Sequence, residues 1–439
     1  SRTTSNAVVN NGGLHGTNER SGTVSLVAGN YYPMLVYFGE NGGGDVIEVS
    51  FTAPGASRTY NGTGFYYQSS YTGPTNPVSF GGNVVLNGNS VVSTGAGSVN
   101  FAGTVNSASG TAKNLTMSTG AGNVTFASTV GNADSLGALS VTSTGTISIG
   151  VNVSSTAAQS YNGALTMTAN STLASSGAGN VAFSSTINGA YALTVNTSGA
   201  TTFGGVVGGT TNLTSITTDS GGTVSIGGNV TTTGAQTYND AMTLTAATVF
   251  SASAFTTSST LSASSYALTI TTDAIALGGN VSGSGALIIQ PKTDTITIAI
   301  GSDASGTLKL DDTELGYLRD GFSSITIGST TATGAIAINY ASAYTFTDPI
   351  TIRKSTGSGS AITLTDEFTS GNLTLASNSI VLNNNVTTSG TQTFTGAVTL
   401  GTSIALASTA AASSGNSISF SSTINGTSAN TESLTLNSG

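Results

Sequence analysis

Four acidic residues form the only cluster of chemically active side chains in the sequence: Asp311, Asp312, Glu314 and Asp320. Paired carboxylates serve as acid and base in polysaccharide-cleaving enzymes, and carboxylate oxygens are the ligands that Ca²⁺ prefers. The simpler interpretation is a solvated insert of one or two helical turns, N-capped by Asp311 or Asp312. We favour the insert, and expect no catalytic, cofactor-binding or metal-binding residues here or elsewhere in the chain.

The remaining candidates for catalysis or cofactor binding are isolated. His15 is the only histidine and lies in a polar leader, so a Ser–His or Cys–His relay has no second histidine to use. The glycine-rich stretch 39–44 matches a phosphate loop loosely, but it does not stand between a strand and a helix. We interpret it as a turn. The chain has no cysteine, which excludes a disulfide framework and a thiolate metal site.

Repeated aromatic and threonine residues raise two binding hypotheses. Tyr161, Tyr238 and Phe394 recur at one phase of a sequence repeat and could form a stripe that stacks on sugars. Residues locked to a repeat usually serve its packing, so we expect them in the core or at a corner. Threonine strings at 166–168 and 231–233 could form a flat ice-binding ladder. Threonine is also an ordinary outward residue of a strand, which is the interpretation we favour.

The composition indicates an ordered chain with few charges. Of 439 residues, 6% are charged and 37% are hydrophobic, which favours order. Nine basic residues and a net charge of −9 argue against a nucleic-acid partner. No apolar run reaches the ~20 residues of a membrane-spanning helix. The chain starts at Ser1 without Met, residues 1–30 lack the charged and apolar regions of a signal peptide, and the chain stops within a strand pattern at residues 434–436. We therefore expect either that a signal peptide was removed or that the chain is a piece of something longer.

A long repeat organises the chain. Gln159-Ser160-Tyr161-Asn162 returns as Gln236-Thr237-Tyr238-Asn239 at an offset of 77 in residue number (238 minus 161), and the same offset joins Ile149 to Ile226. Gln392-Thr393-Phe394 follows the second copy at an offset of 156 (394 minus 238), close to two further periods. Such a fixed period is the signature of a repeat architecture.

Each repeat unit is divided into shorter segments. Apolar strand centres fall at Ile149, Met167, Phe183, Phe203 and Ile226, with successive offsets of 18, 16, 20 and 23. We interpret one unit as four turns of similar length, with Leu165, Met167, Phe183, Phe203 and Ile226 facing one core.

Stacking is what gives such turns a core, because a single turn cannot bury its apolar face alone. The sequence therefore predicts an all-β chain dominated by a parallel β-solenoid. A string of immunoglobulin-like sandwiches of about 78 residues each is the alternative. The fourfold subdivision of the unit and the lack of Trp argue against it.

Five segments follow from these patterns. We predict an irregular leader at 1–20, a small antiparallel β-sandwich-like module at 21–77, and a β-solenoid at 78–290. A less regular solenoid with the short insert follows at 291–353. The solenoid then resumes at 354–439 and continues beyond the chain end. The proline-free run between Pro77 and Pro291 suits uninterrupted ladders, because proline cannot donate a ladder hydrogen bond.

Two resemblances add to this interpretation. Three stretches resemble the second half of the sugar-binding sandwich module of anthrax protective antigen: Leu26-Val27-Ala28-Gly29-Asn30-Tyr31-Tyr32-Pro33, Val36-Tyr37-Phe38-Gly39-Glu40 and Val49-Ser50-Phe51-Thr52-Ala53-Pro54-Gly55. The acidic pair that binds calcium and sugar belongs to the absent first half, so no lectin site is carried over.

The second resemblance covers residues 80–439. Thr345-Phe346-Thr347-Asp348-Pro349-Ile350 and the Gln-Thr-Tyr/Phe units resemble giant bacterial β-strand-repeat adhesins related to filamentous haemagglutinin. That resemblance implies a right-handed parallel β-helix, secretion and adhesion.

We therefore expect a non-enzymatic structural protein at the cell surface or outside the cell: a stalk, an adhesin or a filament subunit. A carbohydrate-binding or polysaccharide-cleaving β-helix is the alternative, and converging Asp, His or Arg side chains on one face would favour it. Expected partners are further copies in head-to-tail association, with the aromatic block at 31–71 as receiving surface, and surface glycans or neighbouring cells. No nucleic acid and no membrane-spanning segment are expected.

Overall fold

A computed structural model describes residues 77–409, 416–428 and 431–438. The chain divides into two compact units, Ser1–Tyr71 and Thr72–Gly439, and all that follows concerns the second. The predicted leader at 1–20 and the predicted module at 21–77, apart from its last residue, lie outside the described residues. So do His15 and the glycine-rich stretch 39–44.

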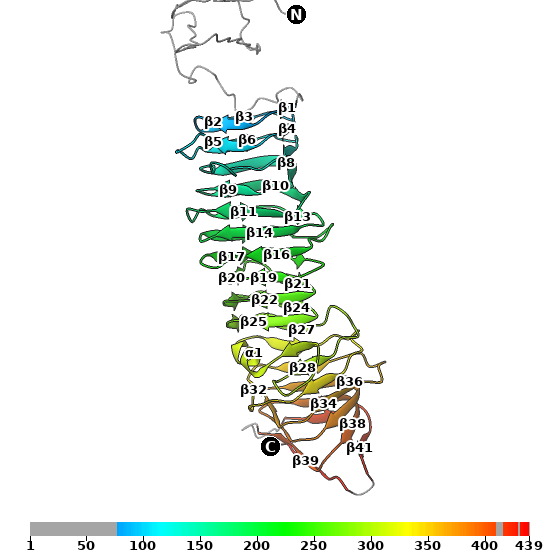
Figure 1. The fold of residues 1–439 in the computed structure, drawn as a ribbon. Helices are drawn as coiled ribbons and strands as arrows, with labels where there is room; N and C mark the ends of the chain where they lie inside the picture. The colour runs from blue at the N-terminus through cyan, green and yellow to red at the C-terminus, as the bar shows by residue number, and fades with distance from the viewer. Residues whose placement is uncertain (1–76, 410–415, 429–430, 439) are drawn as a thin grey trace, which may run out of the picture. The chain divides into compact units, whose positions relative to one another are not determined.

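The described residues form a parallel β-solenoid of about 16 turns, which confirms the predicted fold class. Figure 1 shows the strands stacked coil upon coil from β1 to β41. In each coil the chain passes through three strand positions, which we name faces A, B and C in the order in which it visits them. Four long strands, β8, β10, β36 and β38, continue from one face to the next.

Face A contains β3 (Ser90–Ser93), β6 (Leu115–Ser118), the first halves of β8 (Leu139–Ile149) and β10 (Gln159–Met167), β12 (Val181–Phe183), β15 (Ala200–Phe203), β17 (Thr223–Ile226), β20 (Ala241–Leu244), β23 (Leu261–Ser262), β26 (Val281–Ser282), β32 (Thr345–Phe346), β35 (Phe368–Ser370), β37 (Val386–Thr388), β39 (Ile404–Ser408) and β42 (Leu434–Asn437).

Face B contains β1 (Val78–Phe80), β4 (Val99–Phe101), β7 (Val124–Phe126), the second halves of β8 and β10, β13 (Ile187–Asn188), β18 (Val230–Thr231), β21 (Thr248–Ser251), β24 (Leu268–Thr271), β27 (Ala286–Gln290), β30 (Ser324–Ile327), β33 (Ile350–Arg353), the first halves of β36 (Leu373–Leu382) and β38 (Gln392–Leu400), and β40 (Ile418–Phe420).

Face C contains β2 (Val84–Leu86), β5 (Val105–Ser107), β9 (Val153–Ser155), β11 (Ser171–Ser175), β14 (Ala192–Thr197), β16 (Ser215–Thr218), β19 (Gln236–Tyr238), β22 (Ala254–Thr257), β25 (Ala274–Leu277), β28 (Ile298–Ile300), β29 (Leu308–Leu310), β31 (Ile336–Ile338), β34 (Ala361–Leu364), the second halves of β36 and β38, and β41 (Ile424–Gly426).

One apolar core runs through the stack, because alternate residues of each strand point inward. Identical or similar side chains lie above one another from coil to coil. Phe101 stacks between Phe80 and Phe126, with ring centroids 4.6 and 5.4 Å apart. Phe183 and Phe203 stack in the same way at 5.4 Å. These spacings are close to the ~4.8 Å between neighbouring strands of a sheet, so the ladder itself sets the aromatic stacking.

The residues predicted to share this core do so. They are all buried in one hydrophobic cluster: Leu165, Met167, Phe183, Phe203 and Ile226. They lie on two faces, however. Leu165 and Met167 belong to the face B half of β10, whereas the other three form a face A ladder.

The prediction of four turns per repeat unit is wrong. On its ladder Tyr161 is followed by Phe183, Phe203, Ile226 and Leu244. Four coils therefore take 83 residues (244 minus 161), more than the 77 of one repeat unit.

The repeat offset of 77 falls short of these four coils, so each copy of the repeat starts on a different face. Tyr161 lies on face A, Tyr238 on face C and Phe394 on face B. The sequence repeat and the structural coil therefore have different periods.

Asparagine side chains tie the corners of successive coils together. Asn123 Oδ1 accepts a hydrogen bond from the backbone N–H of Thr146 at 2.8 Å, and Asn180 Oδ1 accepts one from Ala200 at 2.9 Å. Each bond satisfies a backbone donor at a corner, where the ladder is interrupted. These asparagines thus have a structural role between coils.

The stack has a helical insert. Helix α1 (Asp312–Tyr317) follows β29 and is N-capped by Asp311, whose side chain accepts from the Glu314 N–H at 2.9 Å, while Glu314 accepts in return from the Asp311 N–H at 3.0 Å. This reciprocal capping box confirms the predicted short insert, with Asp311 as its N-cap. β27 pairs with β30 and β30 with β33, so face B continues past the insert.

Candidate functional site

The predicted acidic cluster is brought together, but its carboxylates bind backbone. Asp312 Oδ1 accepts from the Ser302 N–H at 2.7 Å, and Oδ2 accepts from Ala341 and Ser342 at 2.9 and 2.8 Å. Burial alone would raise the pKa of Asp312, but these hydrogen bonds outweigh it and lower the pKa below its ordinary value. Asp312 therefore joins α1 to two other segments, one at Ser302 and one at Ala341 and Ser342.

Glu314 has a similar role toward face C. Its Oε1 accepts from the backbone N–H of Leu277 in β25 at 2.9 Å, and its Oε2 closes the capping box at Asp311. Burial raises the pKa of Glu314. The side chain thus fastens α1 onto the preceding coil.

Asp320 pairs with a carboxylate that the sequence did not predict. Asp348 is buried, accepts from the backbone N–H groups of Gly321 and Phe322 at 3.0 and 3.1 Å, and is hydrogen-bonded to the Asp320 side chain. Burial first, and the neighbouring Asp320 carboxyl second, raise the pKa of Asp348 against the effect of its backbone donors. The only feature of the sequence that could have drawn attention to Asp348 is its place in Thr347-Asp348-Pro349, a combination typical of turns.

These carboxylates do not form a metal centre in the part of the chain that the structure describes. There, no group of three or more His, Cys, Asp or Glu residues could hold a metal ion. Each carboxylate of Asp312, Glu314 and Asp348 accepts two or more hydrogen bonds. The chemistry that this arrangement supports is proton sharing between Asp320 and Asp348.

The repeated aromatic residues lie in the core, as predicted. Tyr161, Tyr238 and Phe394 have no exposed surface, so they cannot stack on a sugar from solution. Each follows a buried glutamine two residues earlier, the first residue of each repeated unit, for which the sequence indicated no role. Tyr161 donates to Gln159 Oε1 at 2.8 Å, and Tyr238 donates to Gln236 Oε1 at 3.3 Å.

The three glutamines make the same set of hydrogen bonds at three different corners. The Nε2 group of Gln159 donates to the carbonyl oxygens of Val153 and Ala174 and to Ser155 Oγ. These partners lie six residues before, fifteen after and four before the glutamine. Gln236 and Gln392 repeat the same offsets. Each glutamine therefore joins its own corner to the strand of the next coil.

Lys354 plays a comparable part at a corner with no glutamine. It is 1% exposed, and its Nζ donates to Ser358 Oγ at 3.0 Å, to the Ser360 carbonyl at 2.9 Å and to the Ser360 hydroxyl. Burial lowers the pKa of this lysine. The side chain organises the loop between β33 and β34.

The threonine strings at 166–168 and 231–233 do not form a shared threonine ladder. Thr166 is followed on its ladder by Asn188, Thr231 by Ser251, and Thr232 is buried. A continuous outward row exists instead on face C: Thr172, Thr194, Thr217, Thr237 and Thr256. Its sequence signal is a spacing of about one coil between these threonines rather than a run of adjacent threonines.

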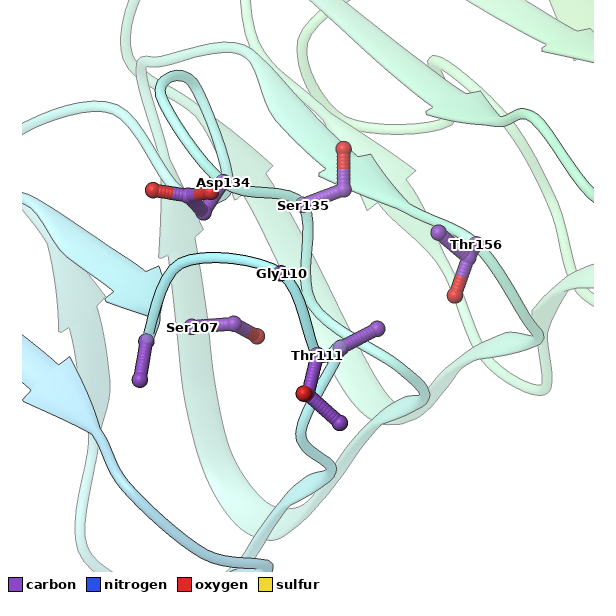
Figure 2. A pocket seen from close by; sticks show the side chains of 8 residues that line it. Ser107, Gly110, Thr111, Asp134, Ser135 and Thr156 are labelled. Carbon is purple, nitrogen blue, oxygen red and sulfur yellow. The ribbon is translucent and has the colours of Figure 1, made fainter.

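A small hollow lies beside face C. The loops after β5 and before β8, together with Thr156 after β9, border an open hollow of about 170 Å³, shown in Figure 2. It is lined by Ser107, Ala108, Gly110, Thr111, Ala112, Asp134, Ser135 and Thr156. Ser107 Oγ already accepts from the Lys113 N–H at 2.8 Å. Sites for small organic ligands usually enclose ~300–1,000 Å³ and are lined mostly by hydrophobic and aromatic side chains. This hollow is smaller, and its lining contains no aromatic residue.

No protein family, no curated protein and no solved structure matches this chain. The resemblances to β-strand-repeat adhesins and to the protective-antigen module therefore stay predictions. Among the described residues, no helix has the length and apolarity needed to cross a membrane.

Proposed function

We propose that this chain is a non-enzymatic structural protein of the cell surface or extracellular space, a stalk, adhesin or filament element built from stacked coils. The observation that carries the proposal is that the buried or partly buried polar and charged side chains hydrogen-bond to the protein's own backbone. Gln159, Gln236, Asp312, Glu314 and Lys354 all hydrogen-bond to backbone groups of neighbouring coils or loops. Such residues hold a scaffold together and leave few groups for substrate chemistry.

The dimensions of the stack support a spacing role. About 16 coils at ~4.8 Å each give a column of roughly 75 Å. The outward row from Thr172 to Thr256 consists of small, uncharged side chains, which present a uniform surface over five coils of that column. Adhesion to surface glycans or neighbouring cells and an extracellular location remain parts of this proposal.

An in-register deletion tests the proposal. Removal of residues 161–243 joins Ser160 to Leu244, which takes the ladder position of Tyr161 four coils earlier. We expect a folded chain whose column is shorter by roughly 19 Å, measured by electron microscopy. The matched control removes 161–242, which places Thr243 inward and should unfold locally, because a one-residue slip exchanges the two faces of a strand.

The alternative, a carbohydrate-binding or -cleaving β-helix, draws on the hollow of Figure 2. A screen of the full chain against soluble and insoluble polysaccharides separates the two functions. We expect neither turnover nor retention in a pull-down. Turnover of a polysaccharide would contradict the structural proposal, and retention abolished by Asp134→Ala would assign a sugar site to the hollow.

A further inference from the structure

Within the described residues, only one of the three ladders runs through the helical insert. On face B, β24, β27, β30 and β33 pair in an unbroken row. On face C, the ladder ends at β25 and starts again at β29, with no pair or bridge between those two strands. On face A, β26 is followed by a single bridge to Leu318, and the ladder starts again at β32. Elsewhere in the described stack, ladders or isolated bridges join successive coils on all three faces.

Face C also contains one strand more than face B at this point. The chain forms β28 first and then turns back through residues 301–307 to form β29. Because β28 pairs with β29 on one edge and with β31 on the other, β29 lies on the side of β25. From the coil of β25 to the coil of β31, face C adds β29 and β28 where face B adds only β27. Face C is therefore the longer side of the column here, by about one strand spacing of ~4.8 Å.

Carboxylates take the place of the missing ladder bonds. The N–H of Leu277, at the end of β25, donates to Glu314 Oε1 at 2.9 Å. The N–H groups of Gly321 and Phe322, which follow the face A bridge, donate to Asp348 at 3.0 and 3.1 Å. A ladder acceptor is fixed in the backbone of the next coil, whereas a carboxylate at the end of a side chain follows its donor by rotation about its χ angles. These bonds therefore hold the two sides together at more than one separation.

Helix α1 lies at the corner opposite the unbroken ladder. It connects β29 on face C with Leu318 on face A, so it occupies the C-to-A corner, across the core from face B. A tilt of one stack against the other about face B opens or closes this corner. The capping box of α1 satisfies N–H groups of the helix start within the insert itself, so the helix start does not depend on the separation of the coils.

We propose that the insert at 291–353 is a joint at which the column bends. Face B is its continuous side, faces C and A are the sides that open, and β29 is the wedge that sets the resting tilt. The stacks on either side, 78–290 and 354–408, are joined on all three faces and move as stiff bodies. The joint deepens the proposed structural function and rests on it, because a bend serves a protein that spans the distance between two surfaces.

Pairs of spin labels on outward residues measure this bend, since the chain has no cysteine of its own. On face C, Thr256→Cys in β22 and Thr363→Cys in β34 lie on either side of the joint. On face B, Val249→Cys and Thr351→Cys lie in the same two coils and on one outward row. Thr172→Cys with Thr256→Cys is the control pair, on the regular outward row of face C.

Double electron–electron resonance should give a broad distance distribution for the face C pair and narrow ones for the face B pair and the control pair. The mean distance of the face C pair should exceed that of the face B pair by at least about one strand spacing, ~4.8 Å, because face C contains the extra strand.

Deletion of residues 301–310 tests the wedge. β28 and β29 pair with Ile298 beside Leu308, an offset of 10 in residue number (308 minus 298). Removal of these ten residues therefore leaves one strand in register and joins Ile300 to Asp311. We expect the mean distance of the face C pair to fall to that of the face B pair, and the face B distance to stay unchanged.

Glu314→Ala tests the carboxylate bond across face C. It removes the acceptor for the Leu277 N–H and should broaden the face C distribution further without changing face B. Glu314→Gln keeps a side-chain carbonyl that accepts from Leu277 and should restore the wild-type width, which separates loss of this bond from loss of the fold. Asp303→Ala, at an exposed position in the loop between β28 and β29, is the control and should leave both distributions unchanged.

Two results would overturn the joint. A face C distribution as narrow as that of the control pair would mean that the column does not bend at the insert. A face C mean that stays above the face B mean after the deletion of 301–310 would mean that β29 does not set the tilt. Neither result bears on the deletion of 161–243, which lies within the regular stack, so the structural role and the joint are judged separately.

Discussion

The buried glutamines differ in one hydrogen bond, and that difference can be measured. Gln159 and Gln236 each accept a hydrogen bond from a tyrosine hydroxyl two residues later, but Gln392 is followed by Phe394. In the described residues Gln392 Oε1 is a buried acceptor without a partner. Because a buried polar atom without a partner is destabilising, this corner is a weak point of the stack.

Phe394→Tyr should repair this corner. The added hydroxyl would donate to Gln392 Oε1, and we expect the free energy of unfolding to rise by about 0.5–1.5 kcal/mol in urea titrations. Phe126→Tyr is the matched control, because it adds the same hydroxyl to an equally buried ring that follows Val124 instead of a glutamine. The control should lose about 1–3 kcal/mol. Equal effects of the two substitutions would rule out the repaired hydrogen bond.

The Asp320–Asp348 pair gives the insert an unusual pH dependence. Burial and Asp320 raise the pKa of Asp348 above its ordinary value of 3.8, so the folded state holds this proton more tightly than the unfolded state. Its contribution to stability is therefore full below the ordinary pKa and falls as pH rises through the raised pKa. Asp320→Asn supplies an amide donor to the Asp348 carboxylate and reduces this loss, while the effect of burial stays.

We accordingly expect Asp320→Asn to be more stable than the wild type at neutral pH and to lose that advantage below the ordinary pKa of an aspartate, in urea titrations at each pH. Asp303→Asn, which removes an exposed carboxylate from the loop between β28 and β29, should leave the pH dependence unchanged. If the two variants have the same pH profile, the carboxyl pair does not govern it.

At the level of elements, the sequence predicted strands and their inward residues but not their assignment to faces. Alternation and coil-length spacing are local, so Met167 and Phe203 could be placed in the core from sequence. The face on which a strand lies depends on the summed lengths of all preceding corners. Tyr161 and Tyr238 therefore look equivalent in sequence, but they lie on faces A and C.

The polar partners that join elements were less predictable still. Asp348 meets Asp320 at a sequence separation of 28 (348 minus 320), and Glu314 meets Leu277 at a separation of 37. Nothing local in the sequence marks either pair. The short helix and its N-cap at Asp311 were predictable because a capping box spans only four consecutive positions.

At the scale of the whole molecule, a solenoid has stability that varies along its axis, because each coil contacts only its neighbours. Coils in the middle of the stack pack against two others. Among the described residues, the coil of β40, β41 and β42 packs against one, and its inward residues are half-buried or exposed. We expect opening to begin there and to proceed coil by coil.

Hydrogen exchange followed by mass spectrometry can measure this gradient on the chain in dilute solution. Amides of β14, β16 and β19 should exchange slowest, and those of β40 to β42 should exchange faster by several orders of magnitude, since they open without the rest of the stack. Uniform protection along the axis would mean that the stack opens as a single cooperative unit, which contradicts coil-by-coil opening.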